Sequence, residues 1–367
     1  MVDLFAGPGG LDMAAEALGV PSIGIEWDAG AVATRTRAGL LTVHADVRTL
    51  RPTDPGFEGA NVLAGGPPCQ TFTVAGHGAG RRALDDVLKF VQRLVDRDKW
   101  SNIEADLAEL EDERTGLVLQ PLHWILEAID NSALNPYHTI VLEQVPAVLP
   151  VWEEYAKALS DEYDTDFGVL RTEEFGVPQT RKRAVLIARR RSGNKDLYSH
   201  RPLRLPAPTH QRYRGEVRDD EGFDFVGSIP KWVSMGEAIP ERRTPFTVIS
   251  NYGTGGDPKA RGERRSDQPS ATITGKVSRN RIVGPDGRDD RFSIYEAGRL
   301  QTFPAAYPWS GKDISQQIGN AVPPRLGMHI LSAALGLARP SKEALDRLAS
   351  WQPQSPKPEG DAEPSES

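Results

Sequence analysis

The sequence predicts an α/β fold, with a mostly parallel sheet covered by helices on both faces and a smaller irregular domain after it. Over the first 190 residues, short apolar runs alternate with amphipathic stretches. This alternation is typical of strand–helix–strand units. From about residue 195 to 290, Pro, Gly, Arg and Asp become frequent and helical periodicity fades. We therefore expect a second, strand-rich domain in that region.

The apolar runs and helical patterns give the expected order of elements. The predicted strands are residues 2–5, 22–25, 61–64, 139–142 and 184–188. The predicted helices are residues 11–18, 122–129, 293–301 and 324–337. Because helical patterning returns after the irregular region, we expect the C-terminal helices to pack back onto the first domain.

These patterns divide the chain into three parts. The large domain is expected to comprise residues 1–190 and 293–339, and the small domain residues 191–292. Residues 340–367 are rich in Ser, Pro and acidic residues, which predicts a disordered tail. Within the large domain, residues 96–114 place three apolar side chains on one helical stripe among charged residues, and a helical insertion on the surface is expected. The three are Ile103, Leu107 and Leu110.

Composition excludes several classes of protein. Of the 367 residues, 38% are hydrophobic and 26% charged, and no apolar run approaches the roughly 20 residues of a membrane span. The first residues carry no basic region and no signal core, so we expect a cytoplasmic protein. A single cysteine excludes a disulfide framework and a zinc cluster built on thiolates, and no metal is expected.

Charge is unevenly distributed along the chain. The net charge is −7, yet residues 171–214 carry 12 Lys/Arg against 3 Asp/Glu, and residues 242–299 carry 12 against 7. A basic centre in an acidic protein is typical of a phosphate-facing surface. The alternative is a basic face that is merely solvated.

The only cysteine, Cys69, lies in the run GGPPCQ at residues 65–70. The run follows a predicted strand, and ligands bind at strand ends in open α/β sheets. Prolines fix the backbone before the thiol, and glycines allow another group to approach closely. A lone cysteine is more often an inert buried residue, but this context favours a nucleophile.

A Gly-rich turn and three side chains predict an adenosine pocket. Gly7 and Gly9 belong to the run DLFAGPGG at residues 3–10, which joins the first strand to the first helix. Glu26 ends the second strand, where a carboxylate can accept hydrogen bonds from ribose hydroxyls. Trp27 can stack on an adenine ring, and Asp46 can accept a hydrogen bond from its amino group. The alternative is that these residues only end strands and form turns, and bind no ligand.

Further polar residues are candidates for the same edge of the sheet. Glu143 directly follows a predicted strand, where a protonated acid can donate a proton to a ring nitrogen and an ionised one can accept a hydrogen bond from an exocyclic amine. Arg181 and Arg183 alternate before the next strand and can hold a carbonyl oxygen or phosphates. Asn320 precedes a proline-started helix and can close the pocket. The alternatives are that Glu143 is a structural ion-pair partner, that the two arginines lie on a solvated turn, and that Asn320 belongs to a helix start with no ligand.

Together these residues resemble the cytosine-5 DNA methyltransferases. The resemblance spans nearly the whole chain, up to about residue 338. The matching parts, in order, are DLFAGPGG at 3–10, Glu26, Asp46, PPCQ at 67–70, Glu143, QTRKR at 179–183, residues 264–274 and GNAVPP at 319–324.

The resemblance implies a Rossmann-like, S-adenosylmethionine-dependent methyltransferase whose small domain recognises DNA and whose target cytosine is flipped out of the duplex. By resemblance, the Cys69 thiolate adds to C6 of the ring, and Glu143 holds N3 and the exocyclic amine. Arg183 contacts the ring carbonyl, and Arg181 supports the site. The residues implied to line the cofactor pocket are Phe5, Gly7, Gly9, Glu26, Trp27, Asp46, Pro68 and Asn320.

The chain departs from the family pattern in three places. Gln144 stands where the family has asparagine, the helical insertion at 96–114 is longer than usual, and the region available for target recognition is short. In that region we expect the loop at 252–256 to approach DNA. The expected phosphate contacts are Arg242, Arg243, Lys259 and Arg261.

The resemblance also implies partners and leaves two alternatives. Double-stranded DNA is the expected substrate, a restriction endonuclease acting on the same site is a possible companion, and a monomer is expected. One alternative is a tRNA cytosine-5 methyltransferase. The other is a DNA-binding protein with a decayed active site, for which Gln144 gives the only support.

Overall fold

The structure of the chain is a computed structural model. It describes residues 1–68, 79–110, 113–191, 202–215, 229–253 and 261–353. Cys69, Lys259 and most of the loop at 252–256 therefore lie outside the described residues. No helix in the described part of the chain combines the length and apolar character needed to cross a membrane.

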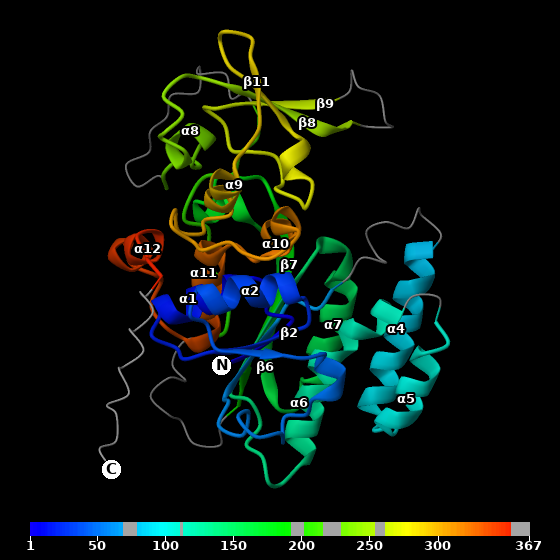
Figure 1. The fold of residues 1–367 in the computed structure, drawn as a ribbon. Helices are drawn as coiled ribbons and strands as arrows, with labels where there is room; N and C mark the ends of the chain where they lie inside the picture. Colours follow the sequence, from blue (N-terminus) through cyan, green and yellow to red (C-terminus); the bar gives the residue numbers. More distant parts are fainter. Residues whose placement is uncertain (69–78, 111–112, 192–201, 216–228, 254–260, 354–367) are drawn as a thin grey trace, which may run out of the picture.

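A seven-stranded sheet in the order β3-β2-β1-β4-β5-β7-β6 forms the large domain (Figure 1). Its strands are β1 (Val2–Leu4), β2 (Ile23–Glu26), β3 (Thr42–His44), β4 (Val62–Gly65), β5 (Thr139–Gln144), β6 (Tyr163–Arg171) and β7 (Lys182–Arg190). The first five run parallel, and β7 is antiparallel to both of its neighbours. The predicted α/β fold with a mostly parallel sheet is confirmed.

The strand order places a ligand cleft next to β1. The chain moves outward from β1 to β2 and β3, then returns to the other side of β1 as β4. At such a switch point the loops after the two central strands diverge and leave a crevice beyond their carboxyl ends. The loop after β1 is the Gly-rich turn, and the loop after β4 leads to Cys69.

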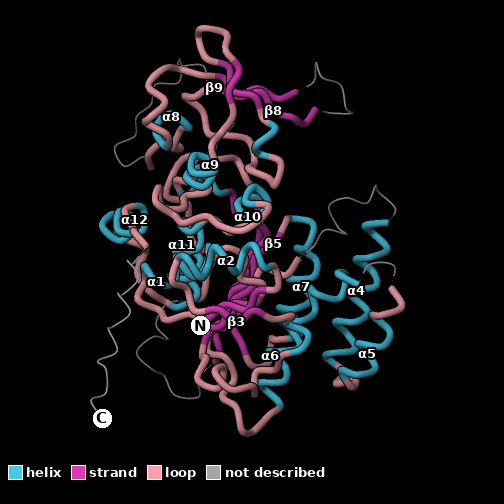
Figure 2. The backbone as a smooth tube through the Cα atoms, viewed as in Figure 1, coloured by secondary structure: helices cyan, strands magenta, loops and turns pink. Residues whose placement is uncertain are grey.

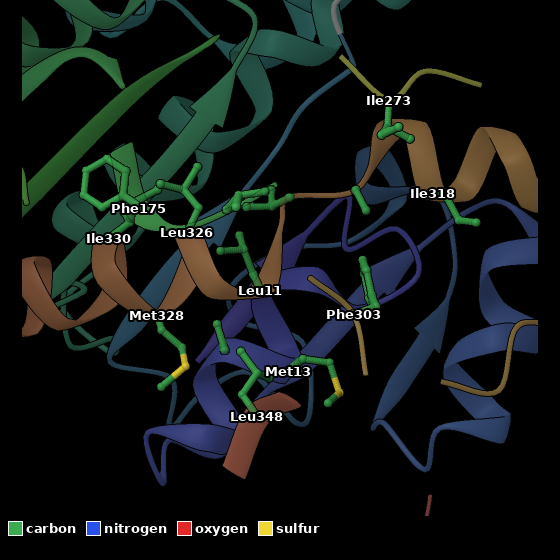
Figure 3. Packing of buried hydrophobic residues seen from close by; sticks show 14 of the residues in the cluster. Leu11, Met13, Phe175, Ile273, Phe303, Ile318, Leu326, Met328, Ile330 and Leu348 are labelled. Atoms are coloured by element: carbon green, nitrogen blue, oxygen red, sulfur yellow. The ribbon is translucent and has the colours of Figure 1, made fainter. Parts of the chain in front are cut away.

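Helices cover both faces of this sheet. One layer contains α1 (Gly10–Ala17), α11 (Pro324–Leu335) and α12 (Lys342–Ala349), and the other contains α4 (Ala79–Val95), α6 (Gln120–Asp130) and α7 (Leu149–Ala158). Alternate residues of β5 enter the two cores: Val141 packs with α11, and Ile140 and Leu142 pack with α6 and α7. Figure 3 shows Leu326, Met328 and Ile330 of α11 in the first of these cores.

The structure corrects the expected tail. Residues 342–349 form α12, and its Ala344 and Leu348 are buried against the layer that contains α1. These two residues are four positions apart and therefore share one helical face. The composition is polar, yet this single apolar stripe is sufficient for docking. The prediction of disorder is wrong for this helix, and residues 354–367 lie outside the described part.

The stretch at 96–114 contains a surface helix, α5 (Trp100–Leu107). Ile103 and Leu107 are buried in the core that contains α4 and α6. Arg93 of α4 bridges Asp98 and Asp106, with N–O distances of 2.6 and 2.5 Å, and so fastens α5 to α4. Figure 1 shows α4 and α5 side by side at the edge of the molecule.

A four-stranded antiparallel sheet, β11-β10-β8-β9, forms the small domain (Figure 2). Its strands are β8 (Thr247–Gly253), β9 (Arg261–Arg265), β10 (Arg281–Val283) and β11 (Asp289–Asp290), and a short helix α8 (Met235–Ala238) lies beside them. The chain then returns to the large domain through α9 (Ile294–Leu300) and α10 (Ile314–Asn320). Phe246, Val248 and Ile282 belong to the same buried cluster as α11, so the two domains share one core.

Arg242 does not have the role expected from the sequence. Its guanidinium pairs with Glu296 at 2.5 Å and Asp290 at 2.9 Å, and it lies over the rings of Phe246 and Phe292. Only 19% of the side chain is exposed. A guanidinium engaged in this way is not available for a phosphate, so Arg242 joins the small domain to α9 instead.

Arg242→Ala is therefore expected to lower the free energy of unfolding by about 1–2 kcal/mol, because Glu296 loses its partner in a half-buried site. Urea denaturation measures the change. Arg243→Ala, at an exposed neighbour, is the matched control and is expected to leave stability unchanged. Equal stability of the Arg242 variant and wild type would contradict the structural role.

Candidate active site

A cavity of about 1170 Å³ opens at the switch point and extends beneath α10. It is lined by the Gly-rich turn, the ends of β2, β4 and β5, the start of β7 and the segment around α10. The sequence-predicted residues that line it are Phe5, Gly7, Glu26, Trp27, Asp46, Pro68, Glu143, Arg181, Arg183 and Asn320. Cys69, the next residue after Pro68, lies outside the described residues.

The carboxylate of Glu26 is held by the backbone at the floor of the cavity. Its Oε2 accepts from the Gly7 amide at 2.7 Å, and its Oε1 accepts from the Asp28 amide at 2.7 Å. Gly7 has φ 55° and Phe5 has φ 61°, so the turn between them is left-handed at both positions. Burial raises the pKa of Glu26, although the two amides oppose this. The carboxylate is thereby fixed in one orientation.

Trp27 and Asp46 stand at the mouth of the same cavity. Trp27 is 70% exposed, which is unusual for so large an apolar side chain and leaves an aromatic face open to a ligand. Asp46 caps a 3-10 helix and accepts from the Arg48 amide at 2.9 Å. Burial raises the pKa of Asp46, but hydrogen bonds from Arg48 outweigh it, and the net pKa is lowered. Asp46 is therefore a stable anion.

Gly9 does not reach the cavity, contrary to the expectation that it contacts a cofactor. It precedes α1 with φ 102°, and a Cβ at this position would collide with the Leu40 side chain and lie 3.0 Å from the Tyr307 hydroxyl. Its neighbour Gly10 packs closely in the same way, since a Cβ there would collide with the Val322 carbonyl oxygen. Gly9 is thus required by the turn and its packing.

Glu143 and Arg183 form a buried ion pair across the β5–β7 pair. Arg183 Nε lies 2.7 Å from Glu143 Oε1, and the two side chains are 11% and 6% exposed. Burial lowers the pKa of Arg183, and Glu143 opposes the shift. The other carboxyl oxygen, Oε2, would lie 3.7 Å from a Cβ at Gly66. The acid therefore lies directly against the loop that leads to Cys69.

Gln144 connects the same two loops. Its Nε2 donates to the Pro67 carbonyl at 2.5 Å, and its Oε1 accepts from the Val145 amide. The longer amide therefore holds the proline-rich loop against the end of β5.

Arg181 supports the cavity from behind. Its side chain is 2% exposed and donates through Nη1 to the carbonyls of Ile273 and Gly319, both at 2.9 Å. Burial lowers its pKa well below the ordinary value, with Arg183 nearby adding to the shift. Asn320 accepts from Gln316 Nε2 at 2.9 Å at the end of α10. Arg181 thus fixes the position of the segment that carries Asn320.

The comparison with protein families decides the assignment. The C-5 cytosine-specific DNA methylases match residues 1–92 and 140–335 of this chain. The chain belongs to the C-5 cytosine-specific DNA methylase family. The matched residues include both sides of the cavity, and they leave out residues 93–139, where α5 and α6 lie.

Curated relatives agree with this assignment. The Type II methyltransferase M.AplI of Arthrospira platensis is 28% identical over 90% of this methylase and 84% of its own length. The Type II methyltransferase M1.HphI of Haemophilus parahaemolyticus is 26% identical over 80% of this chain and 73% of its own length. This chain is a DNA cytosine-5 methyltransferase.

Solved structures show the same fold. S. pombe Dnmt2 methyltransferase superposes with a TM-score of 0.53 at 18% identity, covering 91% of this chain and 97% of its own. Entamoeba histolytica methyltransferase EhMeth gives 0.51 at 13% identity, covering 91% and 96%. At these identities the likeness concerns the fold alone.

DNA methylases of this family use S-adenosylmethionine, and the cavity fits it. A fixed carboxylate at Glu26, an exposed aromatic face at Trp27 and the anion Asp46 can take the ribose, the adenine ring and its amino group respectively. The volume of the cavity, about 1170 Å³, exceeds the roughly 300–1,000 Å³ that is usual for small-molecule sites, so its size allows such a ligand.

Asp3 is a cavity residue of this methylase to which the sequence assigned no role. It lies in β1, is 1% exposed, and its Oδ1 has no hydrogen-bond partner among the described residues. Burial, followed by the charge of Asp12, raises its pKa well above the ordinary value. The sequence does contain a signal for this residue, since Asp3 is a single acid between the apolar residues of a buried strand.

Gln144→Ala is expected to slow methyl transfer about tenfold, because the proline-rich loop loses its hydrogen bond to the end of β5. Single-turnover kinetics measure the rate. Gln144→Asn, which keeps an amide but shortens it by one methylene, is the comparison variant, and its rate is expected to fall between those of Gln144→Ala and wild type. An unchanged rate in Gln144→Ala would show that the contact does not position the loop.

Proposed function

We propose that this methylase modifies a cytosine within a short site in duplex DNA through a covalent adduct on Cys69. The observation that carries the proposal is the buried Glu143–Arg183 pair. It lies against Gly66 and lines the same cavity as Glu26 and Trp27. A cytosine entering this cavity would thus meet an acid and a cation beside the loop that leads to Cys69.

The proposed steps assign one role to each group. The Cys69 thiolate adds to C6 of the flipped cytosine, and Glu143 holds a proton at N3 and accepts from the exocyclic amine, so that electron density rises at C5. Arg183 stabilises the ring carbonyl oxygen. S-adenosylmethionine supplies the methyl group that C5 takes. A base then removes the C5 proton, and the C6–S bond breaks to return the thiolate.

We propose that the cofactor is bound by the cavity residues whose hydrogen-bonding groups or rings suit S-adenosylmethionine. Glu26 would accept from the ribose hydroxyls, Trp27 and Phe5 would contact the adenine, and Asp46 would accept from its amine. Asn320 and Pro68 would close the cavity on either side. Gly7 would allow close approach at the turn.

We propose that duplex DNA lies between the two domains and contacts basic residues of the small domain. Arg243 is exposed and remains a candidate phosphate contact, whereas Arg242 is engaged in ion pairs. We propose that Lys259, which lies outside the described residues, and Arg261 of β9 also contact phosphates. The Type II character of the relatives supports a restriction endonuclease with the same site as a companion, and we infer a monomeric, cytoplasmic enzyme.

Incubation with labelled S-adenosylmethionine and either duplex DNA or tRNA tests the proposal. We expect label in DNA, and sequencing of methylated cytosines then gives the site. Label in tRNA alone would favour the tRNA methyltransferase alternative. DNA binding without label in either substrate would favour a decayed enzyme.

A further inference from the structure

The last helix of the chain lies outside the family match, which ends at residue 335. This helix, α12, together with Trp351, which we call the C-terminal strap (residues 342–351), packs against α1. Figure 3 shows Leu348 of α12 next to Met13 of α1. Trp351 Nε1 donates to Glu16 Oε1 of α1 at 3.4 Å. The strap is therefore joined to the helix that begins directly after the Gly-rich turn.

The Gly-rich turn has a backbone conformation that needs support from outside. Phe5, Gly7 and Gly9 have φ of 61°, 55° and 102°, so the backbone is left-handed at three of the five positions from 5 to 9. A residue with a side chain, such as Phe5, adopts this region only at a cost in free energy. Such a conformation persists where the surrounding groups fix it. The turn therefore depends on its contacts with other segments.

Two long-range hydrogen bonds hold this turn. The Gly7 amide donates to Glu26, and the Tyr307 hydroxyl donates to the carbonyl of Pro8. Pro8 is buried and lines the cofactor cavity. A buried carbonyl that loses its donor is costly, so Tyr307 determines where Pro8 can lie. The position of the turn thus depends on the position of Tyr307.

Trp351 connects the strap with Tyr307. The two rings have centroids 5.7 Å apart and planes 45° apart. Tyr307 also packs against Phe303 and Trp309, with centroids 4.7 and 4.9 Å away. These three rings are buried, whereas Trp351 is half-buried and forms the outer layer of the cluster. Removal of the indole would uncover one side of Tyr307, and a less tightly packed ring holds its hydroxyl less firmly.

We propose that Trp351 is a positioning residue for S-adenosylmethionine: through Tyr307 it holds the Gly-rich turn in the conformation that binds the cofactor. The proposal rests on the proposed placement of the cofactor at this turn, and it is independent of the chemistry at Cys69. No residue of the strap lines the cofactor cavity. The Glu143–Arg183 pair comes from β5 and β7, so the strap acts on cofactor affinity and not on the rate of the loaded enzyme.

Isothermal titration calorimetry with S-adenosylhomocysteine, which the reaction does not consume, tests the proposal. Trp351→Ala is expected to raise Kd about fivefold, and Tyr307→Phe, which removes only the hydroxyl, about tenfold, the equivalent of one hydrogen bond. In both variants KM for S-adenosylmethionine should rise in proportion, while kcat at saturation stays that of wild type. Trp351→Phe keeps a ring over Tyr307 and loses only the donor to Glu16, so its affinity should be close to that of wild type.

Trp100→Ala is the matched control. Trp100 is a half-buried tryptophan on α5 that stacks on His123 with centroids 4.0 Å apart, and it does not line the cofactor cavity. Thermal unfolding should show a loss of stability in both alanine variants, since each uncovers an aromatic partner. Only Trp351→Ala should lose affinity. A lower Tm with unchanged Kd in Trp351→Ala would overturn the proposal, and so would a fall in kcat without a change in Kd.

Two further variants keep the test decisive. If Trp351→Ala does not fold, Trp351→Leu, which still covers part of Tyr307, takes its place. Glu26→Ala is the reference for the cofactor site, and it is expected to lose affinity because its carboxylate is proposed to accept from the ribose. Wild-type affinity in Trp351→Ala with a loss in Glu26→Ala would overturn this inference alone. Wild-type affinity in Glu26→Ala would instead contradict the proposed placement of the cofactor.

Discussion

Cys69→Ser is expected to reduce methyl transfer by at least about 10³-fold, the scale seen when a covalent nucleophile is removed. A serine hydroxyl stays protonated at neutral pH, and serine is a poorer leaving group from carbon. A thiol ionises far more readily, and positive charge nearby lowers its pKa further. Arg183 is a buried cation that lines the same cavity as Pro68, the residue before Cys69.

Two measurements separate loss of chemistry from loss of structure. The serine variant should bind S-adenosylmethionine and DNA with affinities close to those of wild type. Duplex DNA carrying 5-fluorocytosine should form a covalent adduct with wild type only, since the fluorine cannot leave as the C5 proton does. Retention of one-tenth of wild-type activity by the variant would exclude Cys69 as the nucleophile.

Glu143→Gln is expected to lower kcat by about 10²–10⁴-fold, the usual contribution of a positioned acid or base. The amide has nearly the same shape but cannot hold a proton for N3, and it leaves Arg183 buried without a counter-ion. The loss of the ion pair is also expected to destabilise the fold by about 3 kcal/mol. Steady-state kinetics and urea denaturation measure the two effects.

Glu173→Gln is a matched control for this variant. Glu173 is 1% exposed, has an oxygen without a hydrogen-bond partner among the described residues, and does not line the cavity. Loss of the Glu173 carboxylate should leave kcat unchanged. If Glu143→Gln keeps wild-type kcat while losing stability, the acid is a structural ion-pair partner and no more.

The parts of the site that could be predicted from the sequence are those set by local pattern. Glu26 and Glu143 each end a short apolar run, and the parallel sheet brings such positions to one edge. Turn glycines are also local, which is why Gly7 was placed correctly beside the cavity. Gly9 was not, because its neighbours Leu40 and Tyr307 come from distant segments.

Long-range partners explain the remaining differences. Arg242 reads as a free basic residue until Asp290 and Glu296 are brought to it from about 50 positions away. Trp100 and His123 are stacked only because α5 folds back against α6. The pairing of Gln144 with Pro67 spans 77 positions. No local pattern encodes such contacts, since they depend on the tertiary arrangement.

The contact between the Gly-rich turn and the C-terminal helices has a consequence for biosynthesis. Pro8 accepts a hydrogen bond from Tyr307, and Gly10 lies against Val322, so the first turn of the chain is completed by residues made some 300 positions later. A nascent chain emerging from the ribosome cannot complete the packing of this turn until this segment arrives. Contacts of such long sequence separation also slow folding. The cofactor cavity, which Asn320 and Val322 also line, is therefore completed only after this part of the chain has been made.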